Sequence, residues 1–332
     1  MIKILKRIRS FFLKLTGINK LETKIDMLND RLKWLQKYSM YYTDITKPAP
    51  IHGIILLQQQ ALKKILELVD FICLKHKLTY WLGAGYLLGI VRHNGNPIPW
   101  DDDIDIYMLW PDFEKTISLF KELFENSDFI VFFTGYSFKF MKYKNVPINF
   151  SIFPVHQYYK NIESLHEKKC IANKLLNAKT FSDIEYLKAS GYTKSTYKQD
   201  IWDGKLIKTP KKLFDMQQKA KSYLDKYINE GKQPSSCGHL LSFYEIVCYN
   251  KALLWDYEWV FPLKRINFLG IEINIPNNPE LYLYSHYGDF WTFPSEFGAH
   301  KHSLIKFEPE FLNSLNELIN LDISEYYNKI KK

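Results

Sequence analysis

Four aspartates stand close together in the run Trp100, Asp101, Asp102, Asp103, Ile104, Asp105. Acidic and apolar residues alternate over 101–109, which predicts a β-strand. Because side chains alternate between the two faces of a strand, Asp101, Asp103 and Asp105 are expected on one face and Asp102 on the other. Three carboxylates on one face repel one another unless a cation lies among them, and their oxygens select hard ions such as Mg²⁺ or Mn²⁺. The run therefore predicts a metal site that can bind phosphate groups.

An acidic surface turn and a calcium loop are the alternatives for the same run. A calcium loop of the EF-hand type needs a glycine and a distal glutamate at fixed positions, and neither follows here. A surface turn does not account for Ile104, Ile106 and Met108 between and after the acids, nor for Trp100 in front of them. The metal site is the preferred interpretation.

A glycine-rich turn precedes the acidic run at residues 83–89, between a predicted strand at 79–82 and a predicted short helix at 86–91. Such turns offer backbone N–H groups and a helix N-terminus to a phosphate. The turn lacks the full dinucleotide-binding fingerprint, so its interest comes from the acidic strand that follows. Arg92 suits phosphate geometry, whereas a phosphate contact and a buried structural role are equally open for His93. The candidate phosphate or donor ligands here are Gly83, Gly85, Tyr86, Arg92 and Trp100.

The elements that position these residues follow from apolar periodicity. Apolar residues at helical spacing predict a helix over 53–76, and Pro111 opens another that reaches about 125. The remaining expectations are strands at 129–134, 138–142, 149–154 and 271–275, a mainly helical stretch at 160–260, and a terminal helix at 308–330. Mixed strands and helices of this order predict an α+β fold.

The N-terminal segment is strongly basic. The chain of 332 residues has a formal charge of +9, and residues 1–20 hold six basic residues and no acid. The rest of the chain is only mildly basic, which argues against a nucleic-acid partner. Apolar residues between the basic ones predict an amphipathic helix that lies on an anionic membrane surface, and packing of this helix on its own domain is the alternative.

A heptad-like stripe follows, formed by Leu21, Ile25, Leu28, Leu32 and Leu35. It either continues the N-terminal helix or pairs with a second subunit, so a homo-oligomer through residues 21–39 is a further expectation. The segment 47–50, with Pro48 and Pro50, ends the helix. These features divide the chain into a helical appendage at 1–47 and a catalytic domain at 48–332.

The four cysteines are scattered and form no CxxC pair, which indicates a reducing compartment. Cys237, His239 and Cys248 lack a close fourth ligand for a structural zinc ion. No apolar run reaches the length of a membrane span, and no signal-peptide cleavage pattern follows the N-terminal residues. The expected location is the cytoplasm, peripheral on the inner face of the plasma (inner) membrane.

Two stretches, 80–93 and 98–106, resemble the LicD family, which includes the fukutin-related proteins. A second block at 262–294 is similar to the family's C-terminal segment through Tyr287, Gly288 and Asp289, and His302 stands where a histidine often follows. The resemblance spans about 55–305. It implies a nucleotidyltransferase-like fold and transfer of phosphocholine, ribitol phosphate or a similar group from a cytidine-diphosphate (CDP) donor to a glycan. By that pattern Asp103 and Asp105 are the metal-binding pair, with Asp101 close by, and a sugar hydroxyl attacks in line.

The second block also has a purely structural interpretation. Tyr287 and Trp291 are then core aromatic residues, and Gly288 only forms a turn. Because Lys264, Arg265, Asp289 and His302 lie around the block in sequence, a donor or acceptor surface is the preferred interpretation, with Tyr287, Gly288 and Asp289 as candidate ligands.

One residue departs from the family pattern. The family usually has an aspartate directly before an Ile-Phe-Pro-like strand, and this chain has Ser151 there. Nucleotidyltransferase-like folds often use such a carboxylate as a metal ligand or general base. Its absence leaves the base unassigned, with Asp101 and His156 as substitutes.

Three functional hypotheses result. The first is metal-dependent transfer of a phosphate-linked group from a CDP donor to a cell-surface glycan or lipid-linked sugar. The second is a nucleotidyltransferase that makes the activated donor from cytidine triphosphate. The third, motivated by Ser151, is a catalytically weakened binding or scaffold member of a glycan-assembly complex.

Overall fold

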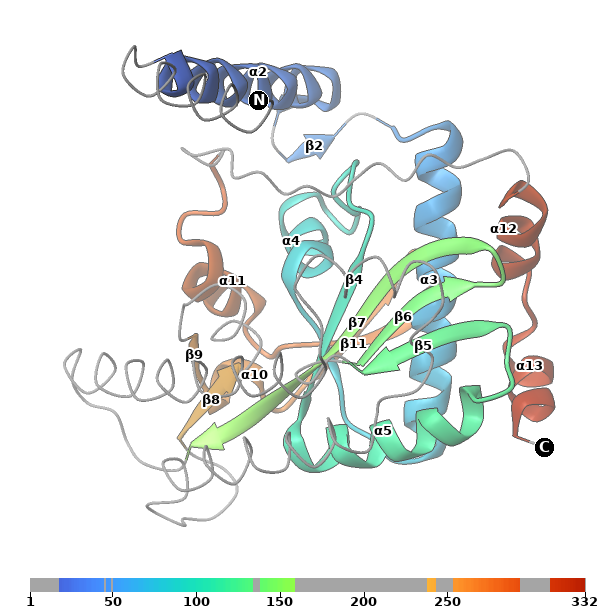
Figure 1. Ribbon diagram of the computed structural model, residues 1–332. Helices are drawn as coiled ribbons and strands as arrows, with labels where there is room; N and C mark the ends of the chain where they lie inside the picture. Colours follow the sequence, from blue (N-terminus) through green and yellow to red (C-terminus); the bar gives the residue numbers. More distant parts are fainter. Residues whose placement is uncertain are drawn as a thin grey trace, which may run out of the picture.

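The computed structural model describes residues 18–44, 46–48, 50–133, 138–158, 238–242, 253–292 and 311–331 (Figure 1). They form an α+β fold in which helices flank a mixed sheet, so the predicted fold class is confirmed. Several predictions fall outside the described residues: the basic helix before Ile18, the positions of Cys170, Cys237, Cys248 and His302, and most of the stretch 160–260.

The central sheet has the strand order β3-β4-β7-β6-β5, and β8 and β9 extend it from β7. β4 and β7 run parallel, and the other neighbouring strands are antiparallel. The strands are β3 (Trp81–Leu82), β4 (Ile104–Leu109), β5 (Phe129–Phe133), β6 (Phe138–Tyr143), β7 (Val146–Tyr158), β8 (His239–Ser242) and β9 (Leu254–Asp256). The acidic strand β4 therefore lies inside the sheet, between β3 and β7.

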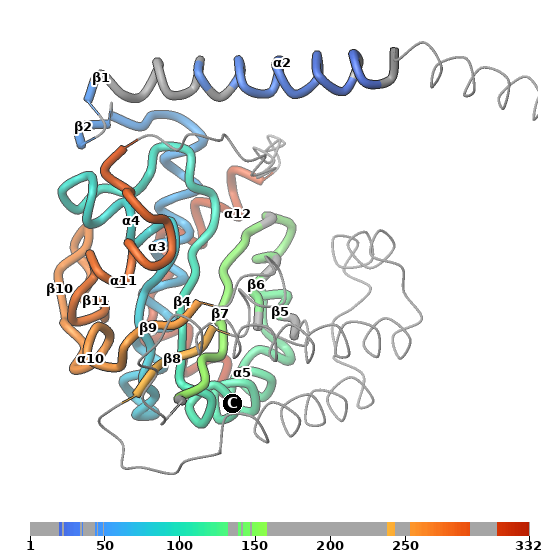
Figure 2. The backbone as a smooth tube through the Cα atoms, turned by 90° about the vertical axis from the view of Figure 1, so that its left-hand side faces the viewer, coloured from blue at the N-terminus to red at the C-terminus, as the bar shows by residue number. Residues whose placement is uncertain are grey.

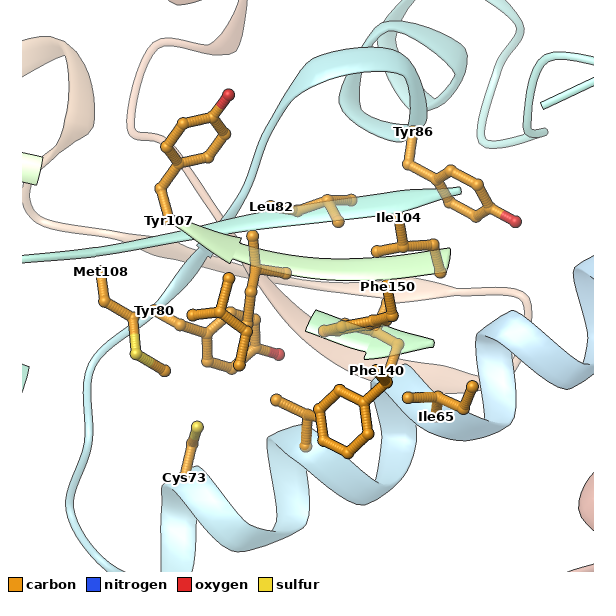
Figure 3. Close-up of a cluster of buried hydrophobic side chains, with 14 of the residues drawn as sticks. Ile65, Cys73, Tyr80, Leu82, Tyr86, Ile104, Tyr107, Met108, Phe140 and Phe150 are labelled. Atoms are coloured by element: carbon orange, nitrogen blue, oxygen red, sulfur yellow. The ribbon is translucent and has the colours of Figure 1, made fainter. Parts of the chain in front are cut away.

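One row of side chains across the sheet enters the core. Ile104, Phe150 and Phe140 occupy neighbouring register positions on β4, β7 and β6, and all three are fully buried. They lie over Ile65 of helix α3 (Gly53–Lys75), whereas Tyr107 projects from the opposite side of the strands (Figure 3). The apolar stripe that predicts the helix at 53–76 is the surface that makes this contact.

Further helices cover the same face of the sheet. Helix α5 (Trp110–Phe124) brings Phe120 and Phe124 against Phe140, with ring centroids 5.9 and 5.0 Å apart. The C-terminal helices α12 (Phe311–Ile319) and α13 (Ile323–Ile330) pack against α3. Edge-to-face aromatic pairs of this kind add about 0.5–1.5 kcal/mol each beyond their buried area.

The opposite face is closed at one end by aromatic residues. Trp81 stacks beside Tyr107, and Trp255 of β9 meets Tyr107 at 5.7 Å between ring centroids. Tyr282 of helix α11 (Pro279–Tyr287) stacks on Trp255 at 4.5 Å. These contacts leave the β4 end that carries Asp105 as the place where a polar site can form.

A hairpin of β10 (Lys264–Phe268) and β11 (Ile271–Ile275) follows the short helix α10 (Tyr257–Val260). Its Arg265 makes two bonds to the buried Asp70 of α3, Nη2 to Oδ2 at 2.6 Å and Nη1 to Oδ1 at 2.9 Å. The Tyr80 hydroxyl also donates to Asp70, at 2.7 Å. This network fastens the hairpin to α3.

Some element boundaries differ from the sequence expectations. The acidic strand begins at Ile104 rather than at residue 101, the strands β8, β9 and β10 were not expected, and β7 is longer than 149–154. The predicted terminal helix is two helices, because Asp322 caps α13 by accepting a hydrogen bond from the backbone N–H of Glu325 at 2.8 Å.

Helix α2 (Ile18–Tyr41) stands apart from the sheet domain and leads into a two-stranded ribbon of β1 (Tyr42–Asp44) and β2 (Lys47–Pro48) (Figure 2). Its heptad stripe is exposed: Leu21, Ile25, Leu28, Leu32 and Leu35 are each more than half accessible to solvent. Within the described ranges, no helix is both long and apolar enough to cross a membrane.

Candidate active site

The loop before β4 is fixed by close packing against helix α4 (Ala84–Arg92). A Cβ atom at Gly89 would lie 2.7 Å from the Asn96 carbonyl oxygen and 2.9 Å from the Ile98 nitrogen. A glycine is therefore needed where the loop backbone crosses the helix, and the loop continues from there through a turn in which Asp101 N–H donates to the Ile98 carbonyl at 3.0 Å.

Two glutamines of α3 hold the same loop from the core side. The Gln59 side-chain amide donates to the carbonyls of Ile98 at 2.9 Å and Asp101 at 3.2 Å, and it lies 3.4 Å from that of Pro99. Gln58 donates to the Asp102 carbonyl at 3.4 Å. These bonds supply donors to the carbonyls of the loop, and they set the position of the aspartates.

Gly85 brings the start of α4 against Asp101. A Cβ atom at Gly85 would lie only 2.5 Å from Asp101 Oδ2. The neighbouring Ala84 has a left-handed φ of 50°, an uncommon conformation for a residue with a side chain. Gly83 extends the β3 pairing, since its N–H donates to the Asp105 carbonyl at 3.0 Å. The glycine turn and the acidic run are therefore in contact.

Asp101 is affected by the charges of the neighbouring aspartates. Burial raises the pKa of Asp101 well above its usual value, and the charges of Asp103, Asp102 and Asp105 raise it further. Its Oδ2 is buried and has no hydrogen-bond partner among the described residues. Burial, and then the charges of Asp101 and Asp103, raise the pKa of Tyr86 well above its usual value. A cation would relieve this repulsion.

Asp103 lies directly before β4, and Asp105 is the second residue of this strand. Asn149 of β7 donates its side-chain amide to Asp103 Oδ2 at 3.1 Å. Asp105 faces Ser151 in the parallel register of β4 and β7, so their side chains share a face of the sheet. The strand alternation that we expected to order Asp101 and Asp103 does not apply to them, because they precede the strand. Their proximity comes from the loop.

The chemistry of these groups fits a hard divalent cation at Asp103 and Asp105. Both are half-buried carboxylates, and Asp101 adds a buried oxygen beside them. In the described ranges no set of three or more His, Cys, Asp or Glu side chains is arranged to enclose a metal ion. A cation here would hence need oxygens from water or from a bound phosphate to complete its coordination.

His156 is an unsuitable substitute for the missing carboxylate at position 151. It stacks on Trp110 of α5 at 4.7 Å between ring centroids, on the face of the sheet that carries the core. Ser151 lies on the other face, with Asp105. Asp101 is the substitute that lies in the carboxylate cluster.

Arg92 and His93 lie at the other end of α4 and are buried. Arg92 Nη1 donates to the Phe290 carbonyl at 3.1 Å, and its Nε donates to His93 Nε2 at 3.1 Å. Burial and the Arg92 charge lower the pKa of His93 to about 4, so its imidazole is neutral at pH 7. The observed contacts of Arg92 connect α4 to the second family block. A phosphate contact remains a prediction.

That second block forms a turn at the end of α11. Gly288 has a φ of 73°, which favours glycine, and Asp289 Oδ1 accepts from the Trp291 N–H at 3.2 Å. Tyr287 is partly exposed and stacks on His286. The Arg92–Phe290 bond places this turn beside the C-terminal end of α4, whereas the carboxylates lie at its N-terminal end.

The remaining candidate residues are distributed as follows. Trp100 is half-buried at the turn before the aspartates. Arg265 is committed to Asp70, so it does not join the turn at 287–289. His239 pairs with Asp256, Nδ1 to Oδ1 at 2.7 Å, while the two cysteines considered with it lie outside the described residues.

Gln58, Gln59 and Asn149 were not singled out in the sequence. A signal for the glutamines exists, because they interrupt the apolar stripe of α3 between Ile55 and Leu62. A polar residue on a buried helix face usually has a buried partner. Asn149 carries no local signal, since its partner lies 46 residues away.

A glycine turn at a helix start, in contact with a carboxylate cluster, is typical of enzymes that handle phosphate groups. Residues 77–183 match the family described as LicD/FKTN/FKRP, nucleotidyltransferase domain, so the predicted relationship to the LicD family is confirmed for this part of the chain. The matched range includes the carboxylate cluster and Ser151 and ends before the turn at 287–289.

Two relatives show local similarity. The lipopolysaccharide cholinephosphotransferase LicD of Haemophilus influenzae is 40% identical over 70 residues, which cover 21% of this chain and 26% of that protein. An uncharacterized protein of Rickettsia typhi is 44% identical over 52 residues, covering 15% of this chain and 16% of that protein. The aligned part of this chain therefore covers only about a quarter or less of the length of each relative.

Proposed function

We propose that this chain transfers a phosphate-linked group, phosphocholine or a polyol phosphate, from a CDP-activated donor to a cell-surface glycan or a lipid-linked sugar. The observation that carries the proposal is the contact between the glycine turn and the aspartates, in which Gly85 lies against Asp101. The relation to a cholinephosphotransferase supports transfer of this class.

Mg²⁺ or Mn²⁺ bound by Asp103 and Asp105 would supply charge neutralisation for the donor phosphates. Asn149 orients Asp103, and the backbone ladder of β4 with β7 orients Asp105. Asp101 is the third carboxylate of the cluster, and we assign to it the removal of the proton from the attacking sugar hydroxyl. The glycine turn gives the donor phosphates close access to backbone N–H groups.

The test uses the purified full chain with Mg²⁺ and CDP-choline, CDP-ribitol or CDP-glycerol, with release of cytidine monophosphate followed by mass spectrometry. Asp103→Asn and Asp105→Asn should each lower the release rate at least about 100-fold, as loss of a group that stabilises transition-state charge typically does. Asp128→Asn, which removes a carboxylate beside Lys329, is the control and should retain the rate.

Other products would support the competing functions. Pyrophosphate release from cytidine triphosphate would identify a nucleotidyltransferase that makes the donor. Donor binding without turnover, unchanged by added metal, would contradict the transferase and favour a binding or scaffold role.

We also propose that the basic N-terminal segment holds the protein on the inner face of the membrane. The support is its six basic residues without an acid in 1–20. Replacement of Lys3, Lys6, Arg7 and Arg9 by glutamine should reduce co-sedimentation with phosphatidylserine vesicles. Equal sedimentation of both proteins would contradict membrane attachment by this segment.

A further inference from the structure

A polar row crosses the sheet beside the carboxylate cluster. Asp105 of β4 faces Ser151 of β7, and Ser151 in turn faces Lys139 of β6. Directly facing residues on neighbouring strands share a face, and the strands are about 4.8 Å apart. The Cα atoms of Asp105 and Lys139 are therefore separated by roughly 10 Å, with Ser151 between them.

This row lies on the face away from α3. The next residues on the same strands, Ile104, Phe150 and Phe140, form the buried row over Ile65 (Figure 3). Because side chains alternate, Asp105, Ser151 and Lys139 project to the opposite side.

Ser151 is the first sign of a ligand in this row. Its side chain is 1% exposed, and among the described residues its hydroxyl has no hydrogen-bond partner. A buried hydroxyl without a partner is unfavourable and in native structures usually indicates a bound water, ion or ligand.

Lys139 is the second sign. Its ammonium lies 5.9 Å from the centroid of the Phe153 ring, and Phe153 follows Ser151 by two residues on the same face of β7. The cation is thus held on the side of the sheet that carries Ser151 and Asp105. No carboxylate pairs with it within the part of the chain that the structure describes.

We propose that Lys139 and Ser151 form a phosphate subsite on the β6 side of the carboxylate cluster. An ammonium group and a hydroxyl donor suit phosphate oxygens, and a diphosphate can reach both this subsite and the carboxylates. An aspartate at position 151, as the family usually has, would stand between Lys139 and Asp105 and pair with the lysine. The serine leaves the lysine free to bind an anion. The identification of the ligand as a CDP donor rests on the proposed function. The binding of a phosphate group at this subsite does not.

The experiment measures binding of inorganic pyrophosphate, with Mg²⁺ present, to the purified full chain by calorimetry. Lys139→Met should weaken binding at least about tenfold, and Lys139→Arg should weaken it less, because loss of a charged hydrogen bond has an effect of this size. Lys115→Met is the matched control, since it removes an exposed lysine from α5 on the other face. It should bind like the wild type, and thermal melting checks that each variant is folded.

The variant Ser151→Asp distinguishes a phosphate subsite from the alternative that Ser151 only marks the loss of a catalytic carboxylate. The subsite predicts weaker pyrophosphate binding in this variant and no gain in turnover. Stronger binding, a gain in turnover, unchanged binding in Lys139→Met, or failure of the wild type to bind pyrophosphate would each overturn it. If pyrophosphate binds as predicted but no CDP donor is turned over, the subsite stands and the proposed function fails.

Discussion

Gly85 lies so close to Asp101 that a methyl group on its Cα would meet Oδ2 at 2.5 Å. Gly85→Ala should displace the carboxylate, because a side chain can move, and should lower donor turnover at least about tenfold. The free energy of unfolding should change by less than about 1 kcal/mol, since alanine favours the helix by a similar amount. Urea unfolding and cytidine monophosphate release measure the two effects.

Gly89→Ala is the contrasting variant, because its Cβ would meet the backbone of Asn96, Pro97 and Ile98 at 2.7–2.9 Å. Backbone cannot move as easily, so this change should lower the free energy of unfolding by about 1–3 kcal/mol. Unchanged turnover in Gly85→Ala, or equal stability loss in both variants, would contradict the assignment of Gly85 to the site.

His93 gives the fold a pH dependence. Burial and the Arg92 charge lower its pKa in the folded protein to about 4, against 6.5 for an ordinary histidine. The unfolded chain therefore binds a proton below pH 6.5 that the folded chain refuses until about pH 4, and the free energy of unfolding falls over that window. Between pH 7 and 4.5 the loss due to His93 should be about 2.5 kcal/mol.

His93→Gln isolates this contribution. Urea unfolding of both proteins at pH 7 and pH 4.5 should show a smaller decrease for the variant than for the wild type, by about the stated amount. The same decrease in both proteins would mean that His93 is not held neutral by its surroundings.

Helix α3 positions the loop of the aspartates through Gln58 and Gln59, and Gln59 makes the shorter bonds to it. Gln59→Leu would remove the side-chain donor to the Asp101 carbonyl and one of the two donors to the Ile98 carbonyl, and it should lower the free energy of unfolding by about 1–3 kcal/mol. Turnover should fall as well, because the loop carries Asp101.

Gln60→Leu is the matched control. Gln60 follows on the same helix, is half-buried, and makes no hydrogen bond to the loop among the described residues. It should stay within about 0.5 kcal/mol of the wild type. If Gln60→Leu and Gln59→Leu unfold alike, the loop is not held by Gln59.

The sequence pattern predicted well those elements whose hydrogen bonds lie within one helix. The stripe of α3 and the proline at the start of α5 gave helices with nearly the observed bounds. The predicted start of β4 was three residues too early. The carbonyls of Asp101 and Asp102 accept hydrogen bonds from glutamines of α3 rather than from a neighbouring strand. β10 was missed because its outward residues are exposed and its stability depends on β11.

In the site, too, residues that are close in sequence could be grouped in advance, and residues from different strands could not. Spacing along the chain was enough to group the glycine turn with the aspartates. Asn149 comes from β7, and only the position of this strand beside β4 brings it to Asp103, while Lys139 of β6 faces Ser151 of β7. Contacts of this kind depend on the order of the strands in the sheet. The alternation of polar and apolar residues within one strand does not predict that order.

At the scale of the whole molecule, the exposed stripe of α2 predicts a dimer. The stripe residues Leu21, Ile25, Leu28, Leu32 and Leu35 are each more than half exposed, and they repeat at the spacing of a two-stranded coiled coil. Lys24 and Arg31 flank the stripe on one side and Asn29 on the other, so a parallel pair avoids placing the basic residues of two copies against each other. Burying such a face in a second copy removes apolar surface from water, which favours association.

Light scattering during size-exclusion chromatography should give the mass of a dimer for the wild type, at twice 39.6 kDa. Leu28→Asp places a charge in the centre of the stripe and should give the monomer mass. Met27→Asp introduces the same charge at the next position, which is also exposed but lies beside the stripe, and should leave the dimer intact. A monomeric wild type would exclude pairing through α2, and equal dissociation of both variants would mean that charge, rather than the stripe, governs the association.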